Sequence, residues 1–364
     1  MARLSGKIQE LLDTAVLSHR LIPFYKRGYF AVWLNAVGVC RSGKFRPEEA
    51  FGMGLFKPDF PQDERALCIS RRDLTKLQEA VNPVSWEPVL KNKGIFYRYC
   101  MSLGVPIPEL YAIFFKRTAG WSYDGSPLIS PGDWEGFFDR LPQEFVVKPC
   151  RGACGIGVNI FSRSGSDFID ADGTLYTSGR LYQTLVSDPA SDSFVIQERL
   201  RNHPEILRLG GCDFLQTVRL VTLADRENRS DILFSYLKLI LGVNITDNFR
   251  RGLSGNMEVP MLPDGRLKPA RQMSADGCGF STVAVHPVTG ISFDGFPLPF
   301  WEHTLSLVKK ISQEFLPIRA IGWDVGITPE GPRIVEANIW WDRGSGHKPA
   351  EELKAAMRLA EARG

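Results

Sequence analysis

The segment IGWDVGITPEGPRIVEANIWWD, residues 321–342, constrains the fold of this chain more than any other. Two apolar stretches flank Pro329–Pro332, a Pro/Gly-containing sequence typical of a turn. The stretches are therefore expected to pair as antiparallel strands of a hairpin. If that hairpin is centred on Glu330, Asp324 and Glu336 are equally far from its centre and lie directly opposite each other.

Asn338 lies two residues beyond Glu336, so it is expected on the same face of the strand. Mg²⁺ prefers carboxylate and amide oxygens and completes its octahedron with waters and substrate phosphates. A solvated sheet face is the alternative interpretation, but unpaired carboxylates inside otherwise apolar strands are costly. We therefore expect Asp324, Glu336 and Asn338 to be metal ligands.

A second informative segment is VVKPCRGACGIGV, residues 146–158. An apolar strand leads to Lys148, and three glycines precede the next strand. Glycines permit positive φ and a close backbone approach, so successive N–H groups can cover a polyphosphate that the lysine neutralises. Taken alone, the segment fits an ordinary glycine-rich hairpin with an exposed lysine equally well. The three glycines are Gly152, Gly155 and Gly157.

Strand patterns dominate the chain after residue 144, whereas helical spacing dominates before residue 104. A Ser/Pro/Gly-rich connection, residues 122–132, separates the two parts. Antiparallel strands accompanied by helices indicate an α+β protein. The helices are expected at residues 1–20, 73–81, 91–103, 178–186, 302–315 and 350–363.

The composition fits a protein of several lobes around a cleft. The chain has 364 residues, of which 44% are hydrophobic and 23% charged. Its most apolar early stretch, residues 31–40, is too short to cross a bilayer, and the N-terminus lacks the pattern of a secretory signal. Seven scattered cysteines fit reduced thiols better than a disulfide framework, so we expect a cytoplasmic protein without a transmembrane segment.

Several function classes lack support. Residues 1–120 carry a net charge of +7 and the remainder −4, but the basic residues are scattered and no motif indicates nucleic-acid binding. Gly38–Lys44 has phosphate-loop spacing, yet Phe45 stands where Ser or Thr must reach magnesium. Cys150 and Cys154 lack the second pair that a zinc site needs. Motifs of dehydrogenases, zincins and α/β-hydrolases are absent.

The ordered set of motifs from FVVKP through VIQERLRNHPEI and TVRLVT to IGWDVGITPEGPRIVEAN resembles the ATP-grasp superfamily. It is most similar to the sugar-transfer-associated branch, which is related to α-L-glutamate ligases, over about residues 90–345. The resemblance implies an α+β fold in which two lobes sandwich ATP, with a smaller α/β lobe before them. The expected divisions are an N-terminal helical extension (1–75), the small lobe (76–135), the nucleotide lobe (136–210), the catalytic and metal lobe (211–349) and a C-terminal helix (350–364).

The resemblance also implies roles in nucleotide binding. Lys148 is expected on the α/β-phosphates beneath the glycine loop, and Lys93 on phosphate, although a surface helix lysine explains Lys93 equally well. Gln197 and Glu198 fall at the adenine hinge, where the backbone of Arg199 and Leu200 is expected to read the base. Glu205 is the candidate for the ribose, with His203 close enough to compete.

Further roles concern the acceptor. Arg219 is expected to face the transferred phosphate, with a structural salt bridge as the alternative. An Asn- and Gly-rich segment at 247–256 resembles an acceptor loop, and Trp340–Trp341 after the metal ligands departs from the wider superfamily. His286 is expected to shape the acceptor pocket, with a turn residue as the alternative. The candidates within the acceptor loop are Asn248, Arg250, Arg251 and Asn256.

The implied reaction is phosphorylation of a carboxylate by ATP, with two Mg²⁺ ions, followed by attack of an amine on the acyl phosphate. The expected function is thus an ATP-dependent carboxylate–amine ligase that acts on small molecules and releases ADP and phosphate. A phosphotransferase acting on a hydroxyl or carboxylate is the alternative enzyme, and a binding module with a degenerate ATP cleft is the third possibility. The sequence identifies neither the substrates nor the oligomeric state.

Overall fold

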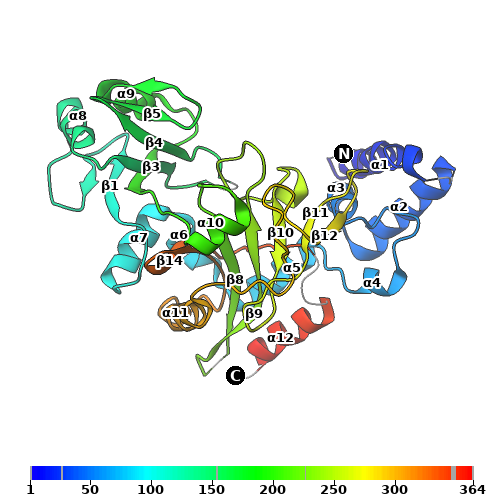
Figure 1. Ribbon diagram of the computed structural model, residues 1–364. Coiled ribbons are helices and arrows are strands. Elements are labelled where there is room, and N and C mark those ends of the chain that lie inside the picture. The colour runs from blue at the N-terminus through cyan, green and yellow to red at the C-terminus, as the bar shows by residue number, and fades with distance from the viewer. Residues whose placement is uncertain (1, 26–27, 153–154, 226, 346–349, 363–364) are drawn as a thin grey trace.

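Two seven-stranded sheets, each built from antiparallel pairs, organise the chain (Figure 1). The computed structural model describes all residues except 1, 26–27, 153–154, 226, 346–349 and 363–364. Its helices and strands give the α+β architecture expected from the sequence.

The first sheet has the strand order β2-β1-β7-β3-β4-β5-β6. Helices α8 (Pro131–Asp139) and α9 (Ser178–Ser187) cover it with an aromatic core that includes Phe114, Trp134 and Phe138. Because β1 pairs with β7, residues expected in the small lobe share this sheet with residues expected in the nucleotide lobe. The strands are β1 (Leu110–Phe115), β2 (Trp121–Ser122), β3 (Glu144–Pro149), β4 (Asn159–Ser164), β5 (Asp167–Asp170), β6 (Leu175–Tyr176) and β7 (Ser193–Glu198).

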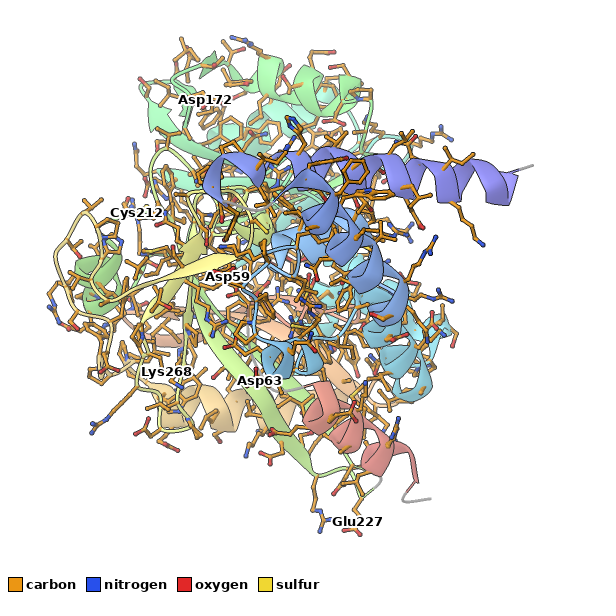
Figure 2. The ribbon with its side chains drawn as sticks, turned by 90° about the vertical axis from the view of Figure 1, so that its right-hand side faces the viewer. Asp59, Asp63, Asp172, Cys212, Glu227 and Lys268 are labelled. Carbon is orange, nitrogen blue, oxygen red and sulfur yellow. The ribbon has the colours of Figure 1, made fainter. Side chains whose placement is uncertain are left out.

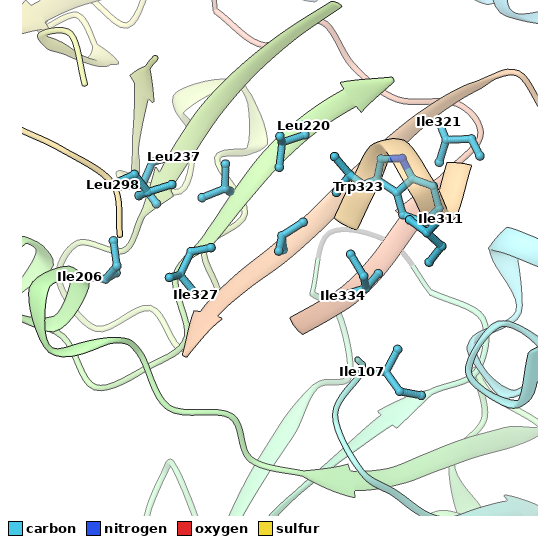
Figure 3. Packing of buried hydrophobic residues seen from close by; sticks show 14 of the residues in the cluster. Ile107, Ile206, Leu220, Leu237, Leu298, Ile311, Ile321, Trp323, Ile327 and Ile334 are labelled. Atoms are coloured by element: carbon cyan, nitrogen blue, oxygen red, sulfur yellow. The ribbon is translucent and has the colours of Figure 1, made fainter. Parts of the chain in front are cut away.

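The second sheet has the order β12-β11-β10-β9-β8-β13-β14. Its apolar face packs on α11 (Trp301–Glu314), where Trp323 and Ile334 meet Ile311 (Figure 3). Alternation along the strands leaves the opposite face for polar side chains. The strands are β8 (Thr217–Ala224), β9 (Ser230–Leu239), β10 (Met257–Pro260), β11 (Ala270–Met273), β12 (Phe280–Val283), β13 (Ala320–Thr328) and β14 (Gly331–Asn338).

Short helices connect these layers. The helix α7 begins where the Asn92 side chain accepts a hydrogen bond from the Ile95 N–H, so the N-cap fixes the position of Lys93. Helices α5 and α12 pack on each other and on one end of the second sheet, around Leu74, Leu353 and Val221. These helices are α5 (Arg71–Val81), α6 (Glu87–Lys91), α7 (Lys93–Ser102), α10 (Pro204–Gly210) and α12 (Ala350–Ala362).

The N-terminal helices α1 (Ala2–His19), α2 (Tyr29–Gly43), α3 (Pro47–Gly52) and α4 (Gln62–Ala66) pack around their own apolar cluster. They lie beside β11 and β12, in blue beside yellow in Figure 1, and they face the viewer in Figure 2. The Gly279 N–H donates to the Phe51 carbonyl at 3.2 Å, which ties this region to the β11–β12 turn.

The phosphate-loop spacing at Gly38–Lys44 falls in the C-terminal part of α2 and its cap, not in a loop between a strand and a helix. This placement agrees with its rejection as a phosphate-binding loop. Among the described residues, no helix is long and apolar enough to cross a membrane.

Candidate functional site

A cavity of about 1260 Å³ lies over the polar face of the second sheet. Lys148 and Gln197 reach it from the first sheet. Met53 reaches it from the N-terminal helices, and Arg71 reaches it from the start of α5. Charged residues of the second sheet form its floor, because residues opposite one another on adjacent strands share a face. In strand order from β14 to β11, these residues are Glu336, Asp324, Arg219, Lys238, Glu258 and Arg271.

The β13–β14 hairpin places Asp324 opposite Glu336, which confirms the predicted pairing. The structure also shows how this happens. Thr328 pairs with Gly331, so the turn is tighter than expected, and this register alone would set Asp324 opposite Val335. A β-bulge next to Asp324 shifts the pairing by one residue and brings Glu336 into place.

Asp324 is buried and is held by two cations. Its carboxylate accepts hydrogen bonds from Arg219 Nε at 2.7 Å and Nη2 at 2.9 Å, and Lys238 Nζ lies 3.1 Å from it. Burial alone would raise the pKa of Asp324, but the charges and hydrogen bonds of Arg219 and Lys238 lower it to about 2. Asp324 is therefore anionic throughout the physiological range, and Arg219 takes part in the salt bridge that the sequence left as an alternative.

Lys238 and Asp247 belong to the site although the sequence reasoning did not identify them. Lys238 Nζ lies 3.2 Å from Asp247, whose carboxylate also accepts from the Thr217 N–H at 2.8 Å and from its hydroxyl. Burial disfavours the charged lysine, yet Asp247 and Asp324 together raise its pKa above the usual value. A lysine inside the otherwise apolar strand ILFSYLKLIL was the available signal.

Lys93 and Lys148 face the same carboxylates from the other side of the cavity. Lys93 Nζ contacts Glu336 Oε1 at 3.2 Å. Lys148 is 6% exposed, and its ammonium donates to the Tyr97 hydroxyl at 2.6 Å. Burial and the nearby charge of Lys93 lower the pKa of Lys148 to about 7. The structure thus brings both predicted phosphate-binding lysines to one place.

The glycine loop connects β3 to β4, with residues 153–154 outside the described part. Gly155 has φ +71°, and a Cβ there would lie 2.7 Å from the Thr246 hydroxyl. Gly157 has φ +75°, and its Cβ would lie 2.8 Å from Pro149. Both positions therefore require glycine. Gly152 and Gly155 line the cavity, whereas Gly157 supports the loop from outside its lining.

The predicted adenine hinge also lines the cavity. Gln197 is buried, and its Oε1 has no hydrogen-bond partner among the described residues. Glu198 accepts a hydrogen bond from the Glu109 N–H at 3.0 Å. Arg199 and Leu200 also line the cavity, and the Arg199 side chain is held by ion pairs with Glu144 and Asp213.

Glu205, Asn256 and His286 are not brought to the cavity lining. Glu205 is exposed on α10 and pairs with Arg208 at 2.6 Å. Asn256 is buried and donates to the Thr246 and Asn248 carbonyls at 2.9 and 3.0 Å, so it shapes the acceptor loop from behind.

His286 Nδ1 accepts from the N–H groups of Val288 and Thr289, which is the turn role left as its alternative. Asn248 and Arg250 of the acceptor loop do line the cavity. The side chain of Arg251 lies outside the described part of the structure.

The oxygen donors fit a hard cation. The described residues include no cluster of three or more His, Cys, Asp or Glu that could hold a metal. The expected set here is two carboxylates and one amide, Asn338. Asn338 Nδ2 lies 3.5 Å from Asp324 Oδ2, and Glu336 lies directly across the hairpin. Two carboxylates and an amide on one face suit Mg²⁺, which keeps waters and phosphate oxygens as its other ligands.

Comparisons with known proteins give low-identity structural likenesses and no match among curated protein sequences. One similar structure is the biotin carboxylase domain of Hydrogenobacter thermophilus 2-oxoglutarate carboxylase with MgADP and bicarbonate (TM-score 0.42, 12% identity, 75% of this chain and 46% of that chain). Another is an ADP complex of N5-carboxyaminoimidazole ribonucleotide synthetase (TM-score 0.41, 12% identity, 77% of this chain and 53% of that chain). This chain spans about half the length of each. A third is the D-alanine–D-alanine ligase from Bacillus anthracis (TM-score 0.37, 12% identity, 75% of this chain and 66% of that chain).

The family comparison covers most of the chain. The sequence model described as sugar-transfer associated ATP-grasp matches residues 72–345, a range that includes both sheets and all the charged residues of the cavity floor. The N-terminal helices α1 to α4 lie before the matched range. With its two antiparallel sheets and the paired Asp324 and Glu336, the chain belongs to the sugar-transfer associated ATP-grasp family.

Proposed function

We propose that the protein is an ATP-dependent carboxylate–amine ligase that forms an amide through an acyl phosphate. The observation that carries the proposal is the convergence of two buried lysines from one side and two carboxylates from the other on a single cavity. Lysines at that position suit the phosphates of a nucleotide, and carboxylates suit the cation that accompanies it. We call this part of the cavity, formed by Lys93, Lys148, Arg219, Asp324 and Glu336, the nucleotide end.

The residues have distinct roles in this proposal. Lys93 and Lys148 hold the phosphates of ATP, and the glycine loop covers them with backbone N–H groups. The hinge backbone at Arg199 and Leu200 binds adenine, and the unpartnered Oε1 of Gln197 is available to a ligand N–H. A ribose contact from Glu205 remains part of the proposal, although it requires that residue to leave Arg208.

Asp324, Glu336 and Asn338 would hold Mg²⁺, for which two ions are proposed. When bound, the metal neutralises the β- and γ-phosphate oxygens. Arg219 stabilises negative charge on the transferring phosphoryl group, and its bond to Asp324 keeps the guanidinium in a fixed orientation. Asn248 and Arg250 contact the acceptor, and Arg251, Asn256 and His286 support it indirectly. Little covalent work falls to the protein, which accounts for a site without a catalytic dyad.

A phosphotransferase that leaves the phosphate on its product is the second candidate, since the same groups position ATP for either reaction. What favours the ligase is the size of the cavity, about 1260 Å³. This exceeds the roughly 300–1,000 Å³ of typical small-molecule sites and leaves room for the second acceptor that a ligase needs. Free cysteines among the described residues accord with the cytoplasmic location proposed for the enzyme and its small-molecule substrates.

Hydroxylamine trapping distinguishes the ligase from a phosphotransferase that acts on a hydroxyl, and phosphate release that requires an added amine, measured without hydroxylamine, distinguishes it from a phosphotransferase that acts on a carboxylate. The protein is incubated with Mg·ATP, hydroxylamine and a panel of amino acids, sugar acids and dicarboxylates, and ADP, phosphate and hydroxamate are measured. A ligase gives all three in equal amounts with its true carboxylate, because hydroxylamine attacks the acyl phosphate. ADP without free phosphate or hydroxamate, together with a phosphorylated product, would establish the phosphotransferase instead.

A further inference from the structure

Two arginines at the end of the cavity away from the lysines form no ion pair among the residues that the structure describes. Arg343, which follows β14, is 8% exposed, and its Nη2 contacts the Met53 sulfur at 3.8 Å. Arg271 of β11 donates from Nη1 to the Ser345 carbonyl at 2.7 Å. Neither guanidinium forms an ion pair with any residue that the structure describes. We call this part of the cavity, formed by Met53, Arg71, Arg271 and Arg343, the far end.

Acidic residues lie near the two arginines of the far end but do not form ion pairs with them. Burial lowers the pKa of Arg271, the charge of Glu258 opposes this shift, and the charge of Arg343 adds to it. The carboxylate of Glu258 is itself engaged by the Ser345 N–H and hydroxyl, both at 2.6 Å. Glu64 and Asp342 also line this end, yet neither is in ion-pair contact with the two arginines. Two like charges near each other in a buried place are costly without a ligand.

The N-terminal region fixes the geometry of the far end. Arg71 donates to the Trp340 and Trp341 carbonyls, both at 2.8 Å, and so holds the segment that leads to Arg343. Lys57 is already neutralised by Asp276 at 3.1 Å. The arginines available to a ligand are therefore those of β11 and of the segment after β14, while the N-terminal residues close the wall around them.

We propose that Arg271 and Arg343 bind an anionic group, a carboxylate or a phosphate, at the end of the acceptor substrate that does not react. The inference rests on the proposed function and names the substrate class for the same cavity. Three strand spacings separate β8, which carries Arg219, from β11, or about 14 Å between backbones. The acceptor is therefore an elongated molecule with an acidic terminus, and the two guanidinium groups recognise it with paired hydrogen bonds.

Calorimetric titration of the full-length protein tests this proposal. The nucleotide end is first saturated with Mg²⁺ and a non-hydrolysable ATP analogue, so that added anions do not compete for Lys93 and Lys148. Inorganic phosphate and acetate are then titrated separately at constant ionic strength, and the anion that binds more tightly identifies the terminal group. We expect Arg343→Gln and Arg271→Gln each to weaken that binding at least tenfold. The matched control is Arg266→Gln, an exposed arginine on the connection before β11 that pairs with Asp264.

Arg343→Lys keeps the charge but loses the paired geometry, so we expect a smaller loss than for Arg343→Gln. Circular dichroism and thermal unfolding establish that each variant is folded. The proposal is overturned if neither anion binds the nucleotide-loaded protein, or if the folded arginine variants bind as the wild type does. Failure of the protein to bind Mg·ADP at all would instead contradict the proposed function. In that case the far end is still tested, because phosphate binding by the wild type can be compared with phosphate binding by the arginine variants.

Discussion

The two ends of the cavity differ in how their charges are balanced. At the nucleotide end, Arg219 pairs with Asp324, and Lys93 pairs with Glu336. At the far end, Arg271 and Arg343 have hydrogen bonds to a carbonyl or a sulfur, and no carboxylate of the described residues lies within ion-pair distance of either. The nucleotide end is therefore held together by its own ion pairs, whereas the far end leaves two guanidinium groups for the anion that we propose as its ligand.

The two ends also differ in their relation to the family match. Every residue of the nucleotide end lies within the matched residues 72–345, as do Arg271 and Arg343, whereas Met53 and Arg71 of the far end precede them. The preorganised ion pairs of the nucleotide end therefore lie wholly within the matched range. The wall contributed by the N-terminal helices is a feature of this chain beyond the matched range, and it is placed where an acceptor would be selected.

The largest expected effect comes from Glu336→Gln at the nucleotide end. Gln has nearly the volume of Glu but lacks the charge of the proposed metal ligand, so the variant is expected to lower kcat about 10³-fold, or about 4 kcal/mol of transition-state stabilisation. Folding should change little, because the Glu336 side chain is 31% exposed and is bonded to Lys93 alone among the described residues. ADP release at saturating Mg²⁺ and the thermal midpoint measure the two quantities.

The matched control for that variant is Glu330→Gln, an exposed residue at the tip of the same hairpin. It is expected to retain wild-type turnover. Near-normal ADP release by Glu336→Gln would show that Glu336 is not a metal ligand. The ion pairs of the nucleotide end would then have a structural role only.

Asp324→Asn is expected to cost stability as well as turnover, unlike Glu336→Gln. Its carboxylate is the shared partner of Arg219 and Lys238, and loss of its charge leaves buried cations with one anion fewer. Breaking a buried ion pair from one side costs about 3 kcal/mol or more. Urea unfolding of the two variants measures this difference, and an equal stability of Asp324→Asn and Glu336→Gln would show that Asp324 does not balance these cations.

Part of this site was readable from the sequence because its geometry is local. Asp324, Glu336 and Asn338 lie in one hairpin, where a two-residue period and a turn signal suffice to place them on one face. The β-bulge that corrects the register leaves no comparable signal in the residues. Lys148 was found in the same way, since the glycines that accompany it follow directly in the chain.

The rest depends on contacts between distant segments. Arg271 and Arg343 come to one place because the segment after β14 runs back across the sheet, where Ser345 bonds to Glu258 of β10 and accepts from Arg271 of β11. Met53 reaches Arg343 from the opposite end of the chain. No local periodicity encodes such contacts. Glu205 shows the converse, because its distance from the hinge suggested a ribose contact, whereas the helix α10 directs it to Arg208.

The junction between the N-terminal region and the sheet offers a smaller test of the far end. Gly279 has φ +70°, and a Cβ there would lie 2.8 Å from the Gly54 Cα. Gly277 has φ +68° but open space around it, so Gly277→Ala isolates the backbone penalty of about 1 kcal/mol. We expect Gly279→Ala to cost about 2 kcal/mol, and to weaken anion binding at the far end while Mg·ADP binding is unchanged.

Urea unfolding and the calorimetric titrations described above measure these effects. Equal behaviour of Gly277→Ala and Gly279→Ala would mean that the N-terminal region can move away from the β11–β12 turn without consequence for the far end.

The smallest expected effect is a pH dependence that separates the two ends. Burial and Lys93 lower the pKa of Lys148 to about 7 in the folded protein, from the 10.5 of a free lysine. Between these two pH values the folded state binds fewer protons than the unfolded state. Burial of the charged Lys148 therefore lowers the free energy of unfolding by its full amount below pH 7, and this loss of stability disappears as the pH rises toward 10.5. Nucleotide phosphates favour the ammonium form, so binding above pH 7 must take up a proton.

The affinity for Mg·ADP is therefore expected to fall as pH rises from 7 to 9, by at most tenfold per unit. Lys148→Met should bind Mg·ADP more weakly than the wild type at pH 7, and its affinity should depend less on pH. Any pH dependence that remains in this variant reports titration of the nucleotide itself and is subtracted. Sulfate does not titrate in this range and guanidinium groups stay protonated, so sulfate binding at the far end should not change. Parallel pH profiles for wild type and Lys148→Met would contradict the role of this lysine, whereas a sulfate affinity that falls with pH would show that a titrating group, not the arginine pair, binds the anion.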